Sequence, residues 1–226
     1  GASLLMDLAH DFKELTYIDF GSGFKVGYRP GEATTDIESF GARMSERFKE
    51  FCLEYGRDLK LIFEPGKFLV SEAGAFIAKV NSTKTTPSTV FAQVNSGFNH
   101  FPRPMMYDAY HHIENLSNPE GEQRLYTIVG YVCETDTFGY DRKLNEVRGG
   151  DLLAFHNAGA YCSSMASQYN SRVRPAEILI ENNTPYLIRE RENIEDLVRG
   201  TVDHGLYSEL KVSEATNEEI TVPSQG

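Results

Sequence analysis

Hydrophobic positions in the first 75 residues alternate between helical and strand-like patterns. Leu4, Leu8 and Phe12 fall on one face at helical spacing, which predicts an amphipathic helix over residues 3–14. The apolar run 15–20 predicts a short buried strand. A second helix is predicted to begin at Thr35, the N-cap of a capping box with Glu38, and to end at Gly56. The next apolar run, 59–63, predicts a second strand, and residues 68–75 predict one or two helical turns.

From residue 76 onward the pattern changes to short apolar runs separated by Gly, Pro, Asn and Asp turns. These runs span residues 76–80, 89–94, 125–132, 152–155, 178–180 and 186–189. They are typical of an antiparallel β-sandwich or barrel, whereas the earlier order of helices and strands is typical of an α/β fold with parallel strands. We therefore divide the chain into an α/β segment (1–75), a carboxyl-terminal β domain (76–212) and a polar tail (213–226), with short helices over 102–110 and 193–199.

Composition and charge indicate which binding partners and which cellular compartment are expected. The 226 residues, 40% of them hydrophobic, are enough to bury the cores of two small domains. A net charge of -11 without a basic stripe argues against nucleic acid as a partner. Three cysteines without paired spacing indicate a reducing compartment, so we expect a cytoplasmic location, and no apolar run is long enough to predict a membrane span. The chain opens in a helical pattern without an initiator Met, which we interpret as the mark of a fragment.

Two successive predicted strands end in glycine-bearing turns, Gly21-Ser22-Gly23 and Glu64-Pro65-Gly66-Lys67. Ligands of parallel α/β barrels bind at the carboxyl ends of the strands, where bare backbone N–H groups can approach a phosphate. Ser22 would add a hydroxyl group and Lys67 a positive charge. The two turns either form such an anion site or serve only to reverse the chain.

Three other stretches carry candidate chemistry. Cys133-Glu134 follows an apolar run and offers a proton donor and a contact for a cationic group, although a cysteine is also a common core residue. Arg103 and Tyr107, four residues apart, can share a helix face and grip a carboxylate, or be a surface arginine and a packed tyrosine. The polar stretch 156–177, between two strand-like runs, predicts a rigid loop over an anionic small molecule.

Adjacent histidines at positions 111 and 112 do not predict a metal site. On a helix their side chains would point in different directions, and no third ligand has suitable spacing. We expect no bound metal.

Five motifs together resemble the diaminopimelate decarboxylases, a family of fold type III (alanine-racemase-like) pyridoxal-phosphate enzymes. In chain order they are Asp19–Phe24, the turn Glu64–Lys67, Arg103–Tyr107, Cys133-Glu134 and Gly159–Glu177. The last is similar to this family rather than to the ornithine or arginine decarboxylases, and the resemblance extends over roughly residues 1–200. It implies the last units of a (β/α)8 barrel followed by the carboxyl-terminal β domain.

The resemblance also implies a role for each matched position. Gly21, Ser22, Gly23 and the turn Glu64-Pro65-Gly66-Lys67 would hold the cofactor phosphate, with Lys67 also facing the substrate. Arg103, Tyr107 and, from the facing subunit of a homodimer, Glu134 would bind the far amino-acid end of meso-diaminopimelate. Cys133, also across the dimer interface, would protonate the carbanion left by decarboxylation, and Tyr161 would contact cofactor and substrate. Cys162 is predicted to be packing, and Arg172 and Arg174 are predicted to support the β domain or the subunit interface.

Three departures from the family pattern matter. Lys67 stands where the family has Arg, which removes the two-pronged guanidinium, and Ser22 replaces the middle glycine of the triplet. The family's Schiff-base lysine and ring-stacking histidine have no counterpart in this chain, so we expect the isolated chain to be inactive. Two alternatives to a diaminopimelate decarboxylase remain. One is a related decarboxylase of a polyamine precursor, of the carboxynorspermidine type, and the other is a non-catalytic regulatory homologue.

Overall fold

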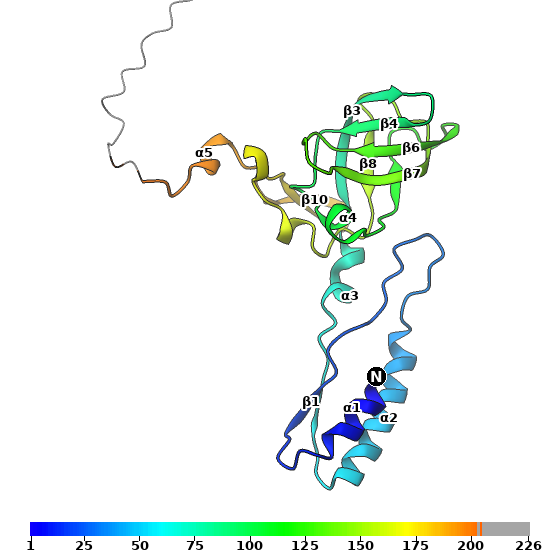
Figure 1. The fold of residues 1–226 in the computed structure, drawn as a ribbon, viewed down its shortest axis with the longest axis vertical. Helices are drawn as coiled ribbons and strands as arrows, with labels where there is room; N and C mark the ends of the chain where they lie inside the picture. Colours follow the sequence, from blue (N-terminus) through cyan, green and yellow to red (C-terminus); the bar gives the residue numbers. More distant parts are fainter. Residues whose placement is uncertain (203, 205–226) are drawn as a thin grey trace, which may run out of the picture.

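The computed structural model describes residues 1–202 and 204, so the predicted tail 213–226 lies outside the described residues. The molecule is elongated: two helices and two strands form one end and a curled sheet the other, with α3 between them (Figure 1). In the first end the elements are α1 (Ala2–Ala9), β1 (Tyr17–Asp19), α2 (Ile37–Tyr55) and β2 (Lys60–Ile62). They are followed by α3 (Gly66–Val70) and the 3-10 turn η1 (Ser71–Ala73).

Strands β1 and β2 pair in parallel, as the α/β order predicts, with Tyr17 opposite Lys60. Their inner faces pack on α1 and α2 around a small core that includes Met6, Ile18 and Phe51. Helix α2 ends as expected at Gly56, whose left-handed φ of 84° suits a residue without a Cβ.

Both predicted helices of this end differ from the expectation at one terminus. The N-cap of α2 is Asp36, which accepts a hydrogen bond from the Ser39 backbone N–H, because the Thr35 hydroxyl instead accepts one from the Lys25 backbone N–H. The predicted capping box at Thr35 is therefore wrong by one residue. Helix α1 ends at Ala9 instead of residue 14, and the Phe12 carbonyl accepts a hydrogen bond from Tyr55 of α2.

The other end is a six-stranded sheet with the order β5-β8-β3-β4-β6-β7. Its strands are β3 (Phe76–Thr85), β4 (Val90–Val94), β5 (Ile113–Asn115), β6 (Gln123–Val129), β7 (Thr137–Asn145) and β8 (Leu152–Phe155). The two edge strands, β5 and β7, contact each other, so the sheet is a nearly closed barrel. Its interior holds a cluster of buried phenylalanines, Phe76, Phe101, Phe138 and Phe155.

The sheet is mixed, which corrects the prediction of a purely antiparallel one. Strands β4 and β6 are parallel, with Phe91 opposite Thr127. A parallel pair needs a long crossover, and residues 95–122 supply it by crossing to the far side, where β5 pairs with β8. Two strands were also missed: β5 has only three residues, and the alternation of β7 is interrupted by Gly139 and by the charged run Asp141 to Lys143.

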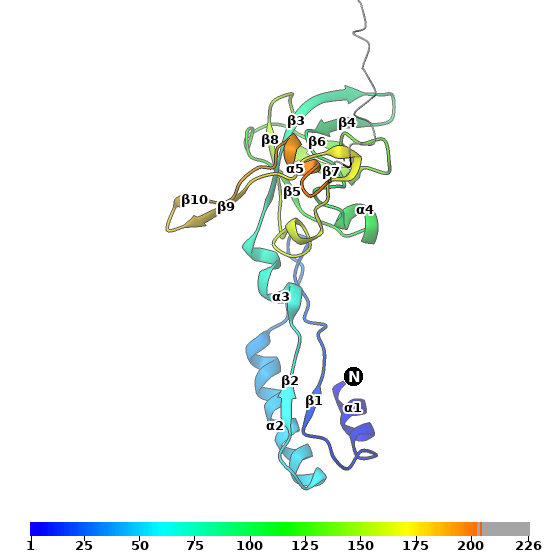
Figure 2. The ribbon, with the colours of Figure 1, turned by 90° about the vertical axis from the view of Figure 1, so that its left-hand side faces the viewer.

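Short elements outside the barrel strands complete the described part of the chain. They are α4 (Arg103–Tyr107), inserted between β4 and β5, the 3-10 turns η2 (Ser163–Met165) and η3 (Tyr169–Ser171), the hairpin β9 (Glu177–Glu181) and β10 (Thr184–Arg189), and α5 (Ile194–Leu197). The hairpin projects from the body (Figure 2). The expected short helices within 102–110 and 193–199 are confirmed.

Candidate functional site

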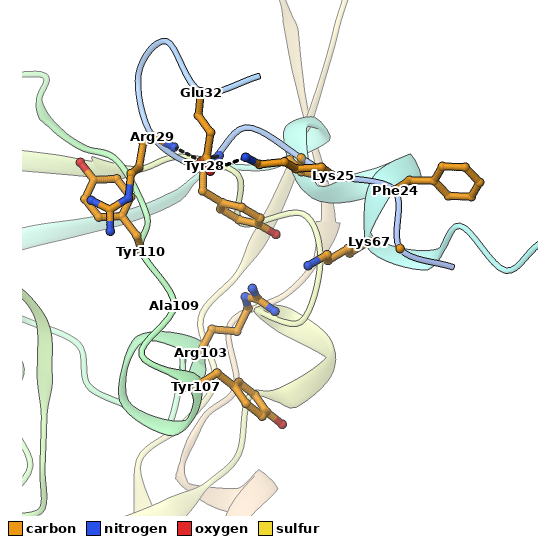
Figure 3. Close-up of a pocket in the computed structure, with 12 residues that line it drawn as sticks. Phe24, Lys25, Tyr28, Arg29, Glu32, Lys67, Arg103, Tyr107, Ala109 and Tyr110 are labelled. Carbon is orange, nitrogen blue, oxygen red and sulfur yellow. Dashed lines mark hydrogen bonds and ion pairs between the residues drawn. The ribbon is translucent and has the colours of Figure 1, made fainter. Parts of the chain in front are cut away.

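A cleft of about 610 Å3 lies where the two ends of the molecule meet, between residues 23–32 (the cleft loop), the first turn of α3, and α4 (Figure 3). The residues that line it are Gly23, Phe24, Lys25, Val26, Tyr28, Arg29, Glu32, Lys67, Arg103, Tyr107, Ala109 and Tyr110. Four of the predicted site residues, Gly23, Lys67, Arg103 and Tyr107, are therefore brought together from three separate parts of the chain.

The two glycine turns are joined by the parallel pairing of β1 and β2. Because both strands end at the same edge, the Glu64 N–H donates a hydrogen bond of 2.6 Å to the Gly21 carbonyl. Gly21 and Gly23 have φ values of 65° and 112°, a region that favours glycine. No atom beyond the neighbouring residues lies within 4 Å of where a Cβ at Gly23 would stand, so the backbone there is open to the cleft.

Positively charged side chains outnumber negatively charged ones in the lining of the cleft. Lys25, Arg29, Lys67 and Arg103 line it, and the acidic residue in that lining is Glu32. The Glu32 carboxylate forms an ion pair with Lys25, with Nζ 3.0 Å from Oε1. It also accepts hydrogen bonds from the Tyr28 and Arg29 backbone N–H groups. These hydrogen bonds, that of Arg29 first, hold the pKa of Glu32 below its usual range. Three cations are thus left to face an anionic ligand.

Arg103 occupies the centre of this group. It lies at the start of α4, and its Cζ is 5.4 Å from the centroid of the Tyr28 ring and 5.7 Å from that of Tyr161. The Arg103 Nε–H donates to Nε2 of His111 at 3.3 Å. The guanidinium is held against two aromatic rings and one imidazole, and no carboxylate within residues 1–202 and 204 forms an ion pair with it.

His111 is wholly buried behind Arg103. Its Nδ1 lies 2.9 Å from the His156 carbonyl oxygen. The pKa of His111 is lowered to about 4, chiefly by burial and to a smaller extent by the charges of Arg103 and Arg142, against an opposing effect of the hydrogen bond to His156. The imidazole is therefore neutral at physiological pH.

Acidification from pH 6.5 to pH 4 is expected to reduce the free energy of unfolding by about 3 kcal/mol through His111. In this window the unfolded chain binds the proton and the folded chain does not, so the contribution is complete above pH 6.5 and is lost as the pH falls to 4. Urea unfolding followed by circular dichroism across this range measures the effect. The His111→Gln variant is the control because it lacks the titrating group, and an equal pH dependence of the two proteins would contradict the assignment.

The polar stretch 156–177 is tied down at several points, as predicted. Ala158 N–H donates to the Gly74 carbonyl at 2.7 Å, and the Asn157 side chain donates to the Gly27 carbonyl of the cleft loop at 2.8 Å. Tyr161, with a φ of 58°, directs its hydroxyl toward Gly66, where an added methyl carbon would lie 3.6 Å from it. This loop therefore brings Tyr161 to the edge of the cleft.

Other residues of the same stretch have structural contacts. Cys162 is buried in the barrel core, and burial raises the pKa of its thiol to about 12. Arg174 forms an ion pair of 2.5 Å with Glu192, which lowers the pKa of Glu192 to about 2. The packing role predicted for Cys162 is confirmed, and Arg174 supports the fold around β10.

Cys133 and Glu134 do not line the cleft. They are exposed on the turn between β6 and β7, and a hydrogen bond to the Glu134 carboxylate raises the pKa of the nearby Tyr169 hydroxyl. The buried Asp136 shapes this turn, because its carboxylate accepts hydrogen bonds from the Val132 and Phe98 backbone N–H groups at 2.8 and 2.6 Å. The thiol and the carboxylate are presented outward from the barrel.

Several cleft residues were missed from the sequence. Tyr28, Lys25 and Arg29 lie in a loop without a recognisable motif, and the sequence signal for them is that they come within six residues of the glycine turn. His111 was considered only as a metal ligand. Across residues 1–202 and 204, no three His, Cys, Asp or Glu side chains gather as a metal site, and none of the helices there has the length and apolar character to cross a bilayer.

Comparison with known proteins identifies the family. Residues 18–159 match the model of the pyridoxal-dependent decarboxylase C-terminal sheet domain. The chain belongs to the pyridoxal-dependent decarboxylases. Its nearly closed mixed sheet is the sheet domain of that family, and the resemblance seen in the motifs is confirmed at the level of the family.

Individual relatives of this decarboxylase family carry a more specific name. The chain is 42% identical over 204 residues to the diaminopimelate decarboxylase of Methanothermobacter thermautotrophicus, covering 87% of this chain and 47% of that protein. It is 38% identical over 199 residues to that of Escherichia coli K12, covering 82% and 47%. The structure of the diaminopimelate decarboxylase of Methanocaldococcus jannaschii with L-lysine superposes with a TM-score of 0.77 at 34% identity, covering 89% of this chain and 46% of the other. The chain spans about half the length of these relatives.

Proposed function

We propose that this chain is the carboxyl-terminal portion of an enzyme that decarboxylates meso-2,6-diaminopimelate to L-lysine and carbon dioxide with pyridoxal phosphate. The observation that carries the proposal is the convergence of Gly23, Lys67, Arg103 and Tyr107 on one cationic cleft, with Tyr161 at its edge. The relatives of 38–42% identity are named for this activity.

The cleft suits a phosphorylated cofactor. Open backbone at Gly23 lies beside the positively charged Lys67, and three cationic side chains are not neutralised by Glu32. The turns Gly21-Ser22-Gly23 and Glu64–Lys67 would therefore hold the phosphate, as in the family resemblance. When bound, pyridoxal phosphate supplies the electron sink for loss of carbon dioxide, and the protein supplies orientation and the proton.

Arg103, Tyr107 and Tyr161 would receive the substrate. The planar guanidinium of Arg103 matches the geometry of a carboxylate, and the Tyr107 side chain lies beside it at the mouth of the cleft (Figure 3). Diaminopimelate carries a second amino-acid group at its far end, which this pair would bind. Lys67 adds a point charge where the family has Arg.

Cys133 and Glu134 would act in the cleft of a second copy of the chain, in a homodimer. Their exposed position on the β6–β7 turn, away from the cleft of their own chain, supports this arrangement. In the partner's site Glu134 would bind the far ammonium group of the substrate. Cys133 would deliver the proton that replaces the departing carboxylate.

Residues 1–75 would be the last units of a (β/α)8 barrel, and residues 76–212 the carboxyl-terminal domain. The parallel pair β1–β2 and the separate hydrophobic clusters of the two ends support this division. The three free cysteines support a cytoplasmic location.

A substrate panel tests the proposal. A longer polypeptide that contains this chain, supplied with pyridoxal phosphate, is expected to release carbon dioxide and L-lysine from diaminopimelate, and the 226-residue chain alone is expected to release none. Lysine, ornithine and carboxynorspermidine serve as comparison substrates, with carbon dioxide release as the measurement. Turnover of carboxynorspermidine alone, or turnover by the isolated chain, would overturn the proposal.

A further inference from the structure

We propose that His111 is a positioning residue, which accepts the Arg103 Nε–H hydrogen bond and so aims the guanidinium fork into the cleft. The inference deepens the proposed function and rests on it in one respect, namely that Arg103 binds substrate. The contacts of His111 itself are independent of the substrate.

The hydrogen bonds of His111 determine its tautomer. A carbonyl oxygen can only accept, so Nδ1, 2.9 Å from the His156 carbonyl oxygen, must carry a proton. In a neutral ring Nε2 is then bare and can only accept. The group that faces it, Arg103 Nε–H at 3.3 Å, can only donate. Each ring nitrogen of His111 therefore has a partner of the complementary type: Nδ1–H faces an acceptor and Nε2 faces a donor.

Packing prevents the ring from turning out of this arrangement. The Phe101 ring meets it edge-on at a centroid distance of 4.5 Å, and the Tyr28 ring does so at 5.0 Å. Tyr28 is itself anchored, since its hydroxyl is hydrogen bonded to that of the buried Ser71 at 3.0 Å. His111 thus connects the barrel core, through Phe101, to the cleft loop, through Tyr28.

The nitrogen atoms of Arg103 therefore have two different roles. Nε is occupied by His111, while within residues 1–202 and 204 the two Nη groups donate to no protein acceptor. These two groups form the fork that pairs with a carboxylate. Without a fixed acceptor at Nε, the long side chain would lose that orientation, and a ligand would have to order it on binding.

Two substitutions at His111 separate positioning from packing. The amide oxygen of Gln can take the place of Nε2 and accept from Arg103, whereas the amide of Asn reaches only the place of Nδ1. Both remove the ring and its aromatic contacts. In the longer polypeptide, His111→Asn is expected to raise the KM for diaminopimelate about tenfold with kcat nearly unchanged, and His111→Gln to stay within about threefold of the unsubstituted enzyme.

A measurement without turnover completes the test. In 15N-labelled 226-residue chain, long-range proton–nitrogen NMR spectra are expected to show a protonated Nδ1 and a bare Nε2 at His111, and a slowly exchanging Arg103 Nε–H that exchanges faster in His111→Asn. A protonated Nε2, or equal KM values for the Gln and Asn variants, would overturn the role of His111 while the proposed function stands. Absence of diaminopimelate turnover in the unsubstituted polypeptide would overturn the proposed function, while the NMR result still decides the tautomer and the hydrogen bond.

Discussion

Replacement of Cys133 by Ala is expected to lower kcat for diaminopimelate decarboxylation at least about 100-fold, because a positioned proton donor contributes rate enhancements of that order. KM is expected to change little, since the thiol acts after the substrate is bound. Steady-state kinetics of the longer polypeptide measures both constants. Cys52→Ala is the matched control, because Cys52 lies on α2, packs against the core of the first end and does not line the cleft. An unchanged kcat in Cys133→Ala would show that another group delivers the proton.

The location of Cys133 away from the cleft of its own chain allows a sharper version of this experiment. Mixed dimers of Cys133→Ala and Arg103→Ala subunits would contain one site with both residues intact if the site is shared across the interface. Random mixing is then expected to restore about a quarter of the unsubstituted activity, because half of the dimers are mixed and each has one working site. No recovery would place both residues in the site of a single chain.

Arg103→Lys is expected to raise the KM for diaminopimelate roughly 10- to 100-fold. The lysine keeps the charge but loses both the fork that pairs with a carboxylate and the Nε–H that donates to His111. Hydrogen bonds to charged groups contribute about 1.5–3 kcal/mol each, which corresponds to this range. The measurement is the dependence of the initial rate on substrate concentration. Arg47→Lys on the solvent-facing side of α2, where Arg47 pairs with Glu50, is the control for replacing an arginine by a lysine elsewhere in the chain. An unchanged KM in Arg103→Lys would show that Arg103 does not bind the substrate.

Local patterns predicted most of the elements correctly. The helix that ends at Gly56 and the two strands beside it follow from periodicity and from a glycine that adopts a left-handed φ. The N-cap of that helix was misplaced from Asp36 to Thr35, because the sequence does not show that the Thr35 hydroxyl is used by the Lys25 backbone. Such competition between nearby hydrogen-bond donors is decided by the path of the loop.

The strand pairing of the barrel could not be predicted from local sequence patterns. An apolar run indicates a strand but not its neighbour, so the parallel pairing of β4 with β6 was not predicted. Strand β5 is three residues long and is defined by its pairing with β8, not by any alternation of its own. Both features depend on contacts between distant segments.

By itself, the sequence determined the chemical repertoire of the candidate site: the two glycine turns, Lys67, Arg103, Tyr107, Tyr161 and the Cys133-Glu134 pair. These are properties of residue type and local order. Only the tertiary structure decided which of them meet. Parallel pairing of β1 and β2 joins the two turns, and the long crossover after β4 brings α4 to them, while Cys133 and Glu134 remain outside on the β6–β7 turn. The place of His111 behind Arg103 could not be predicted from the sequence. Burial keeps that histidine neutral, and the hydrogen bond of its Nδ1 to the His156 carbonyl, forty-five residues away, leaves Nε2 as its single acceptor.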